Sequence, residues 1–247
     1  MLIAQLKQRL LGKPGLKRHL NFGSEAAYDI WAGSYDAQPD NLMIALDEQV
    51  FSALLKRVDM SGKNMIDIGC GTGRHWPEIL KHKPANLTGF DVSAKMLTQL
   101  KAKFPEADVV KIDPDQPLRL KEKTYDVLIS TLTIAHIADI EQSVKNWTNS
   151  LKEQSDILIT DFHAEALAGG GKRTFENEGR NISILNYVHS IPKLLKLFNA
   201  EGFALEALEE RFVDEQVKHF YEKKNALAVY HKFKNQPMIY GMLLIRK

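Results

Sequence analysis

The chain has 247 residues, of which 44% are hydrophobic and 26% are charged, and its formal net charge is +2. This composition predicts one folded domain with a sizeable core, and the weak charge gives no electrostatic reason to expect a nucleic-acid partner. A single cysteine, Cys70, excludes an internal disulfide and a cysteine metal cluster.

Residues 1 to 24 form a basic segment without acidic residues, and Leu2, Ile3, Leu6 and Leu10 recur in it at helical spacing. We expect a helix that docks on the domain that follows. Weak contact of residues 1 to 20 with an anionic membrane surface, or a transit sequence for an organelle, are the open alternatives. Because the chain has no apolar run long enough to span a bilayer and no secretory signal, a soluble cytoplasmic protein is the main expectation.

Strands and helices are predicted to alternate from residue 64 to residue 162, which is the pattern of a parallel sheet covered by helices on both faces. The predicted strands are 64–68, 87–91, 107–112, 125–131 and 156–162, and the predicted helices are 77–81, 94–103 and 140–151, the last with Asp139 as its N-cap. After residue 162 a glycine-rich insertion precedes a helix at 191–200. The chain then reads as strand, helix and strand over 203–213, 214–233 and 238–246.

The first of these strands runs into a loop with glycine at positions 69, 71 and 73. Glycine lets the main chain turn tightly and bring its N–H groups against a ligand. The second strand ends in Asp91, where a carboxylate can accept hydrogen bonds from a ribose diol. A dinucleotide and S-adenosylmethionine both satisfy this arrangement, but Arg74 stands where a dinucleotide fingerprint needs its third glycine, which disfavours NAD.

Several motifs in order, over about residues 60 to 162, resemble the class I S-adenosylmethionine-dependent methyltransferases of the small-molecule type. Asp67 to Gly73 matches the D-x-G-C-G-T-G loop of that family, and Gly89 to Leu97 is similar to its G-x-D-x-S-x-x-M-L segment. Residues 112–113 and 125–130 resemble its acid after the third strand and its fourth strand. Tyr28 to Asp36 resembles the Y-D-x-W-A-x-x-Y-D segment that folds over the cofactor.

This resemblance implies an α/β fold with a Rossmann-like seven-stranded sheet of order 3-2-1-4-5-7-6, in which the last strand is antiparallel. It also implies an N-terminal helical cap at 1–55 and a methyltransferase domain at 56–247. The insertion at about 163–190 and the helical segment at about 214–233 would form a lid over the substrate. The implied cofactor is S-adenosylmethionine, with S-adenosylhomocysteine as product.

The resemblance also assigns the cofactor site. Asp91 would bind the ribose, Val92 and Met96 would cover the adenine, and Asp113 would accept from the adenine amino group unless it is only a turn residue before Pro114. The complete predicted set is Tyr28, Trp31, Asp67, Gly69, Cys70, Gly71, Gly73, Asp91, Val92, Met96, Asp113 and Thr131. Within it, Cys70 is interpreted as a packing residue, and the aromatic pair either covers the cofactor or forms a buried patch.

Three histidines are candidates for the acceptor side of the reaction: His163, which we place first, then His136 and His189. A base is optional, because positioning can supply most of the acceleration of methyl transfer. Asp161, Arg173 and Tyr35 are predicted to bind substrate. Asp161 could instead orient His163 or anchor the methionine end of the cofactor, and a loop arginine is commonly a solvated cation. No metal is expected, since the fourth strand ends in Ser130 and Thr131.

The sequence therefore predicts a methyltransferase that acts on a small molecule, with a hydroxyl or an amine favoured over carbon as acceptor. An NAD(P)-binding oxidoreductase is the first alternative, and a non-catalytic S-adenosylmethionine-binding assembly factor is the second. The identity of the acceptor and the oligomeric state stay open.

Overall fold

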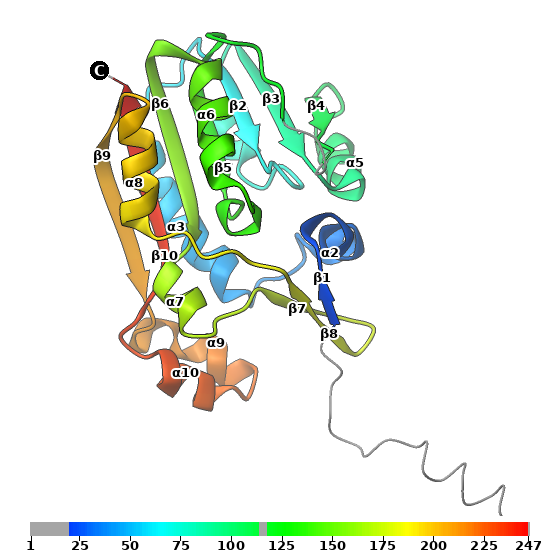
Figure 1. Cartoon of the computed structure of the whole chain (residues 1–247). Helices are drawn as coiled ribbons and strands as arrows, with labels where there is room; N and C mark the ends of the chain where they lie inside the picture. The colour runs from blue at the N-terminus through cyan, green and yellow to red at the C-terminus, as the bar shows by residue number, and fades with distance from the viewer. Residues whose placement is uncertain (1–19, 114–117, 247) are drawn as a thin grey trace, which may run out of the picture.

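The computed structural model of the chain describes residues 20–113 and 118–246 (Figure 1). Residues 1–19 of the basic segment, which include all the apolar positions at helical spacing, therefore lie outside the described residues. No helix in the described ranges is both long enough and apolar enough to cross a membrane.

A seven-stranded sheet of order β4-β3-β2-β5-β6-β10-β9 forms the centre of the molecule. β10 runs antiparallel to both of its neighbours, and the pairs among β4, β3, β2, β5 and β6 are parallel. The predicted fold class and strand order are thus confirmed. The strands are β2 (Asn64–Ile68), β3 (Asn86–Asp91), β4 (Asp108–Lys111), β5 (Tyr125–Thr131), β6 (Leu151–Phe162), β9 (Phe203–Phe212) and β10 (Pro237–Arg246).

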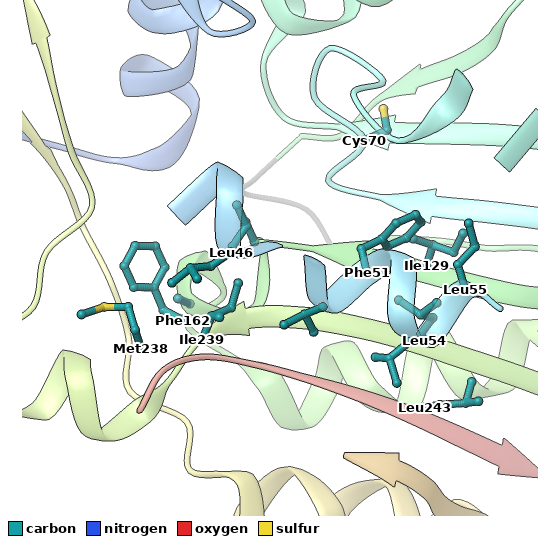
Figure 2. Packing of buried hydrophobic residues seen from close by; sticks show 14 of the residues in the cluster. Leu46, Phe51, Leu54, Leu55, Cys70, Ile129, Phe162, Met238, Ile239 and Leu243 are labelled. Atoms are coloured by element: carbon teal, nitrogen blue, oxygen red, sulfur yellow. The ribbon is translucent and has the colours of Figure 1, made fainter. Parts of the chain in front are cut away.

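Helices cover both faces of this sheet, and the side chains of each strand alternate between them. On one face α3 (Leu42–Leu55), α4 (Trp76–Lys81) and α5 (Ala94–Lys103) share a core cluster with Met65 and Ile129. Figure 2 shows the α3 part of this cluster, where Phe51 and Leu54 pack above the strands. On the other face α6 (Ile140–Ser150) and α8 (Ile191–Ala200) pack on Ile66 and Leu128. The apolar runs of the strands are therefore buried on both sides, as a parallel sheet requires.

The close approach of α3 to the sheet depends on Gly241 of β10. A Cβ at this position would lie 2.3 Å from Val50 Cγ1 and 2.8 Å from Leu54 Cδ1, both on α3. Only glycine fits there without displacing these two side chains.

The segment predicted as one helix at 214–233 is divided into three short pieces, so this part of the prediction is wrong. The pieces are η3 (Glu215–Val217), α9 (Lys218–Lys223) and α10 (Leu227–Phe233). Asn225, between the last two, has φ +51°, a left-handed conformation that ends a helix. The segment turns back on itself and packs at one end of the sheet (Figure 1).

A second sheet, which the sequence did not predict, joins the N-terminal region to the insertion. β1 (Leu20–Phe22) pairs in parallel with β8 (Arg180–Ile184), which pairs antiparallel with β7 (Thr174–Asn177). The insertion also carries α7 (Ala164–Ala168). We call the β1-β8-β7 sheet the lid sheet, and it lies beside α2 (Ser24–Trp31). Its apolar side chains form a separate small core with α2 and η1 (Ala32–Ser34), consisting of Ala27, Trp31, Ala32, Tyr35, Met96, Phe175, Ile182 and Ile184.

Candidate functional site

A cavity of about 590 Å³ lies where the carboxyl ends of β2, β3 and β5 meet α2, α6 and the segment that follows β8. This is the position at which open α/β sheets bind ligands. Of the predicted site residues, Tyr28, Tyr35, Gly69, Asp91, Val92, Asp113, Thr131 and His136 line it. Within the described parts of the chain the other predicted residues are absent from this lining: Trp31, Asp67, Cys70, Gly71, Gly73, Met96, Asp161, His163, Arg173 and His189.

The glycine loop after β2 takes the conformation that its sequence predicts. Gly69, Gly71 and Gly73 have φ values of +76°, +52° and +70°, which side-chain-bearing residues rarely adopt. At Gly69, which lines the cavity, an added Cβ would lie 2.0 Å from Thr133 Oγ1. Arg74, next along the chain, forms an ion pair with Asp47 of α3, so it fastens the loop to the helix that covers the sheet.

Asp91 closes the other side of this loop. Its Oδ2 accepts from the Gly71 N–H and its Oδ1 from the Ser93 N–H, both at 2.8 Å. The residue is 7% exposed, and burial raises the pKa of its carboxyl to about 6 despite these hydrogen bonds. Because each carboxylate oxygen has a further lone pair, Asp91 can still accept hydrogen bonds from a ligand in the cavity.

An apolar wall and a second carboxyl group lie next to Asp91. Val92, Ile112 and Leu118 line the cavity together with Asp113. Such a wall suits a flat heteroaromatic ring, and the acid beside it suits an exocyclic amino donor. Met96, predicted for the same wall, packs in the small core under the lid sheet instead.

Tyr28 and His136 form a hydrogen-bonded pair in the lining of the same cavity. Tyr28 Oη lies 3.0 Å from His136 Nε2, and His136 Nδ1 lies 3.2 Å from the Leu185 carbonyl oxygen. Since a carbonyl only accepts, Nδ1 carries the proton and Nε2 accepts from the tyrosine hydroxyl. Burial, and then the positive charge of Arg173, lower the pKa of His136 to about 4, so this imidazole is neutral at pH 7.

The other two candidate histidines are used elsewhere. His163 is the N-cap of α7: its Nδ1 accepts from the Glu165 N–H at 3.3 Å, and its Nε2 lies 3.1 Å from Glu210 Oε1. His189 Nε2 donates to the Ile137 carbonyl oxygen at 2.8 Å. The structure thus places His136 in the cavity wall. His163 and His189 do not line this cavity, and their rings form hydrogen bonds elsewhere.

Asp67 and Cys70 belong to the buried support of the loop. Asp67 Oδ2 accepts from Trp76 Nε1 at 2.8 Å, and burial raises the pKa of this carboxyl to about 7. Burial likewise raises the pKa of the Cys70 thiol, and its sulfur packs against Gly89 of β3. A buried, protonated thiol is a packing residue rather than a nucleophile.

Of the predicted substrate residues, Tyr35 lines the larger cavity and Arg173 lines a second cavity of about 310 Å³, together with Trp31, Phe162 and residues of α9 and α10. Arg173 Nη2 donates to Tyr35 Oη at 3.2 Å. Asp161 lies nearby but accepts from the Ala135 and Phe162 N–H groups, at 2.8 and 2.6 Å. Burial raises the pKa of Asp161 to about 7.

Several residues of the larger cavity are absent from the predicted set of site residues. Leu132, which follows β5, has φ +52°, a strained conformation for a branched side chain at a ligand site. Its strain gave no signal in the sequence. Others come from α6 and from the lid sheet and its flanks: Gly23, Ser24, Gln142, Ser143, Asn146, Leu185 and Tyr187. The amphipathic pattern of α6 marks the outward face that carries the polar residues among these, but nothing local assigns that face to a ligand.

A search of the described ranges finds no group of three or more His, Cys, Asp or Glu side chains that could hold a metal ion. The polar groups that line the larger cavity include the carboxyl groups of Asp91 and Asp113 and the neutral Tyr28–His136 pair. Such a set binds and orients an uncharged or cationic organic ligand.

Comparisons with known proteins agree with this arrangement. Residues 66–159 match the family model described as a methyltransferase domain. An uncharacterized methyltransferase of Emericella nidulans is 25% identical over 237 residues, covering 77% of this chain and 81% of that protein. A malonyl-[acyl-carrier protein] O-methyltransferase of Bacillus anthracis is 26% identical over 140 residues, covering 56% of this chain and 52% of the relative.

Among solved structures, an S-adenosylmethionine-dependent methyltransferase of Mesorhizobium loti superposes with a TM-score of 0.61 and 20% sequence identity, covering 79% of this chain and 96% of that one. At this identity the likeness concerns the fold.

Proposed function

We propose that the chain is a class I S-adenosylmethionine-dependent methyltransferase and that it transfers the methyl group of this cofactor to a small hydroxylated or amine-bearing molecule. One observation supports the proposal most: a single cavity joins the glycine loop and Asp91 on one side to the Tyr28–His136 pair on the other. Cofactor groups and acceptor groups thereby line the same space.

The residues present fit the cofactor. Asp91 would accept from the two ribose hydroxyls, and Asp113 from the adenine amino group, with Val92 and Leu118 on the adenine ring. Gly69, which packs against Thr133, would offer main chain without a side chain to the methionine portion, and Thr131 lines the same cavity. The cavity volume of about 590 Å³ lies within the range of about 300–1,000 Å³ that is usual for ligand and cofactor sites.

S-Adenosylmethionine supplies an electrophilic methyl group on a sulfonium, so the protein's main task is to position the acceptor. Holding two reactants in line contributes about 7–11 kcal/mol, more than the factor of about 10²–10⁴ from a base. His136 orients the Tyr28 hydroxyl, and this hydroxyl would hold the acceptor heteroatom. His136 Nε2 would accept the proton that the acceptor releases, relayed through the Tyr28 oxygen. S-Adenosylhomocysteine would then be the product.

A small acceptor is favoured because the N-terminal cap and the insertion both contribute to the wall of the cavity. The N-terminal cap, up to residue 55, supplies Tyr28 and Tyr35, and the insertion at 163–190 supplies Leu185 and Tyr187. We infer that these parts, with the helical segment at 214–233, act as the lid of the methyltransferase domain. A polymer would need an open groove instead.

Two measurements test the proposal. Calorimetry should give binding of S-adenosylmethionine and S-adenosylhomocysteine and none of NADH. An assay with radiolabelled methyl-S-adenosylmethionine on fractionated metabolites should then label at least one small molecule, with Asp91→Ala as the inactive control. Malonyl-[acyl-carrier protein], the acceptor in the name of the Bacillus anthracis relative, belongs in the same assay.

Other results would reject it. Tight NADH binding without a response to S-adenosylmethionine would favour an oxidoreductase. Cofactor binding without transfer to any fraction would favour a non-catalytic assembly factor.

A further inference from the structure

We propose that Arg173 and Trp31 form a buried anion subsite, so that the molecule methylated in the adjoining cavity is a carboxylate-bearing one. This inference rests on the proposed function and narrows its substrate class. The carboxylate would pair with Arg173 and accept from the Trp31 indole N–H. The rest of the molecule would then extend toward Tyr28.

The first reason is that Arg173 is a buried charge without a carboxylate partner. The residue is 3% exposed, and across residues 20–113 and 118–246 no ion pair to it is found. An arginine stays protonated even when it is buried. Burying an unpaired charge is costly, and folded proteins tolerate it chiefly where a ligand or another group compensates the charge.

The second reason is that two hydrogen-bond donors are left over at the same place. In the described part of the chain, Arg173 Nε and Trp31 Nε1 are both buried without a hydrogen-bond partner. The two residues come from the insertion and from α2, and both line the cavity of about 310 Å³. Unsatisfied buried donors are rare in native proteins, and two on neighbouring side chains indicate a missing acceptor.

The surroundings of Arg173 do not remove its charge. Its guanidinium carbon lies 5.2 Å from the Trp31 ring centroid, 5.7 Å from that of Phe162 and 5.9 Å from that of Tyr28. These contacts offset part of the desolvation cost but bring no negative charge. Asp161 is the nearby acid and its charge attracts that of Arg173, but within residues 20–113 and 118–246 no ion pair joins the two side chains, and each Asp161 oxygen accepts one backbone N–H.

Other charged groups on this cavity make it more positive. Lys172 and Lys224 line it, from the insertion and from the end of α9. Asp40 also lines it, but its carboxylate is hydrogen-bonded to Lys223 Nζ at 2.6 Å. A ligand that enters this cavity therefore meets a positive field, which favours an anion.

Arg173 also touches the proposed reaction site. It donates to Tyr35 and lies over the ring of Tyr28, and both tyrosines line the larger cavity. Arg173, which lines the smaller cavity, thus contacts two side chains that line the larger one. A molecule anchored by its carboxylate at Arg173 would have its other end within reach of the Tyr28–His136 pair.

The test begins with the native acceptor pool. A metabolite extract is split on an anion exchanger at pH 7.5, and both pools are assayed with radiolabelled methyl-S-adenosylmethionine. We expect the acceptor activity in the retained, anionic pool. Activity confined to the unretained pool would overturn the subsite and leave the methyltransferase proposal standing. No transfer with either pool would overturn both.

Variants then locate the anion. Arg173→Gln should raise the KM for the retained acceptor by about 10- to 150-fold, because at least one hydrogen bond to a charged group is lost. Its affinity for S-adenosylhomocysteine should stay within about twofold of wild type. Arg173→Lys should restore part of the loss. Arg180→Gln is the matched control, because it is an exposed arginine of the same insertion.

A weaker affinity of Arg173→Gln for S-adenosylhomocysteine, with no change in KM for the acceptor, would overturn the assignment. It would place the methionine carboxylate of the cofactor at Arg173 instead. If Arg173→Gln does not fold, Trp31→Phe serves in its place, since it keeps the ring and removes only the indole N–H. An unchanged KM for this variant would also contradict the subsite.

Discussion

Removing the Asp91 carboxylate should weaken cofactor binding by two to four orders of magnitude. In the structure each oxygen of Asp91 already accepts one backbone N–H, from Gly71 and from Ser93, both at 2.8 Å. One lone pair on each oxygen is left for the two ribose hydroxyls. Charge-assisted hydrogen bonds contribute about 1.5–3 kcal/mol each, so the two together account for about 3–6 kcal/mol, or about 10²- to 10⁴-fold in Kd.

The assay is calorimetry with S-adenosylhomocysteine on wild type, Asp91→Asn and Asp91→Ala, with the Tm of each variant recorded. Asp108→Asn, which changes an exposed acid of the neighbouring strand β4, is the matched control and should bind normally. An Asp91→Ala protein that folds and loses less than about fivefold in affinity would refute the reasoning.

The same carboxyl group predicts a pH dependence. Burial raises the pKa of Asp91 to about 6, so the ionised form that accepts ribose hydrogen bonds predominates above pH 6 and is lost below it. S-Adenosylhomocysteine affinity should therefore fall about tenfold between pH 7 and pH 5, which corresponds to about 1.4 kcal/mol. Asp91→Asn should show a much flatter profile over this range. An equally steep fall in the variant would assign the titration to another group.

Three further changes are predicted. Burial raises the pKa of the Asp67 carboxyl from its ordinary value of 3.8 to about 7. The contribution of this group to the free energy of unfolding is therefore fully present below pH 3.8 and is lost as the pH rises through 7. The ligand-free Tm should be higher at pH 5.5 than at pH 8, and Asp67→Asn should reduce this difference. Gly69→Ala should abolish S-adenosylhomocysteine binding in calorimetry, because its Cβ would meet Thr133 Oγ1 at 2.0 Å, and adding Thr133→Ala should recover part of it. Tyr28→Phe should lower kcat by about 10- to 100-fold with cofactor affinity within about threefold, because His136 loses its partner; a normal kcat in steady-state assays would remove the pair from the mechanism.

The sequence by itself determined the half of the site that is local along the chain. The glycine loop is encoded in consecutive residues, because positive φ at Gly69, Gly71 and Gly73 is a property of glycine itself. The position of Asp91 was also predictable, because the helix and the strand between it and the glycine loop set where that strand ends relative to the loop. Apolar strand segments that alternate with helical segments along the chain likewise predicted the strands and the parallel core of the sheet.

Only the tertiary structure decided which side chains line the larger cavity. His136 and His163 both follow a strand, and no local pattern separates them. His136 reaches the cavity because Leu185, 49 residues later, accepts from its ring, while His163 is held by α7 and by Glu210.

The lid sheet decided the rest. β1 and β8 pair although about 160 residues separate them in the chain, and Trp31 and Arg173 are both buried beside this sheet. In the sequence Arg173 resembles a solvated loop cation, because burial depends on which distant segment covers a residue. Contacts between segments far apart in the chain leave no periodicity in either segment, so they appear only once the chain has folded.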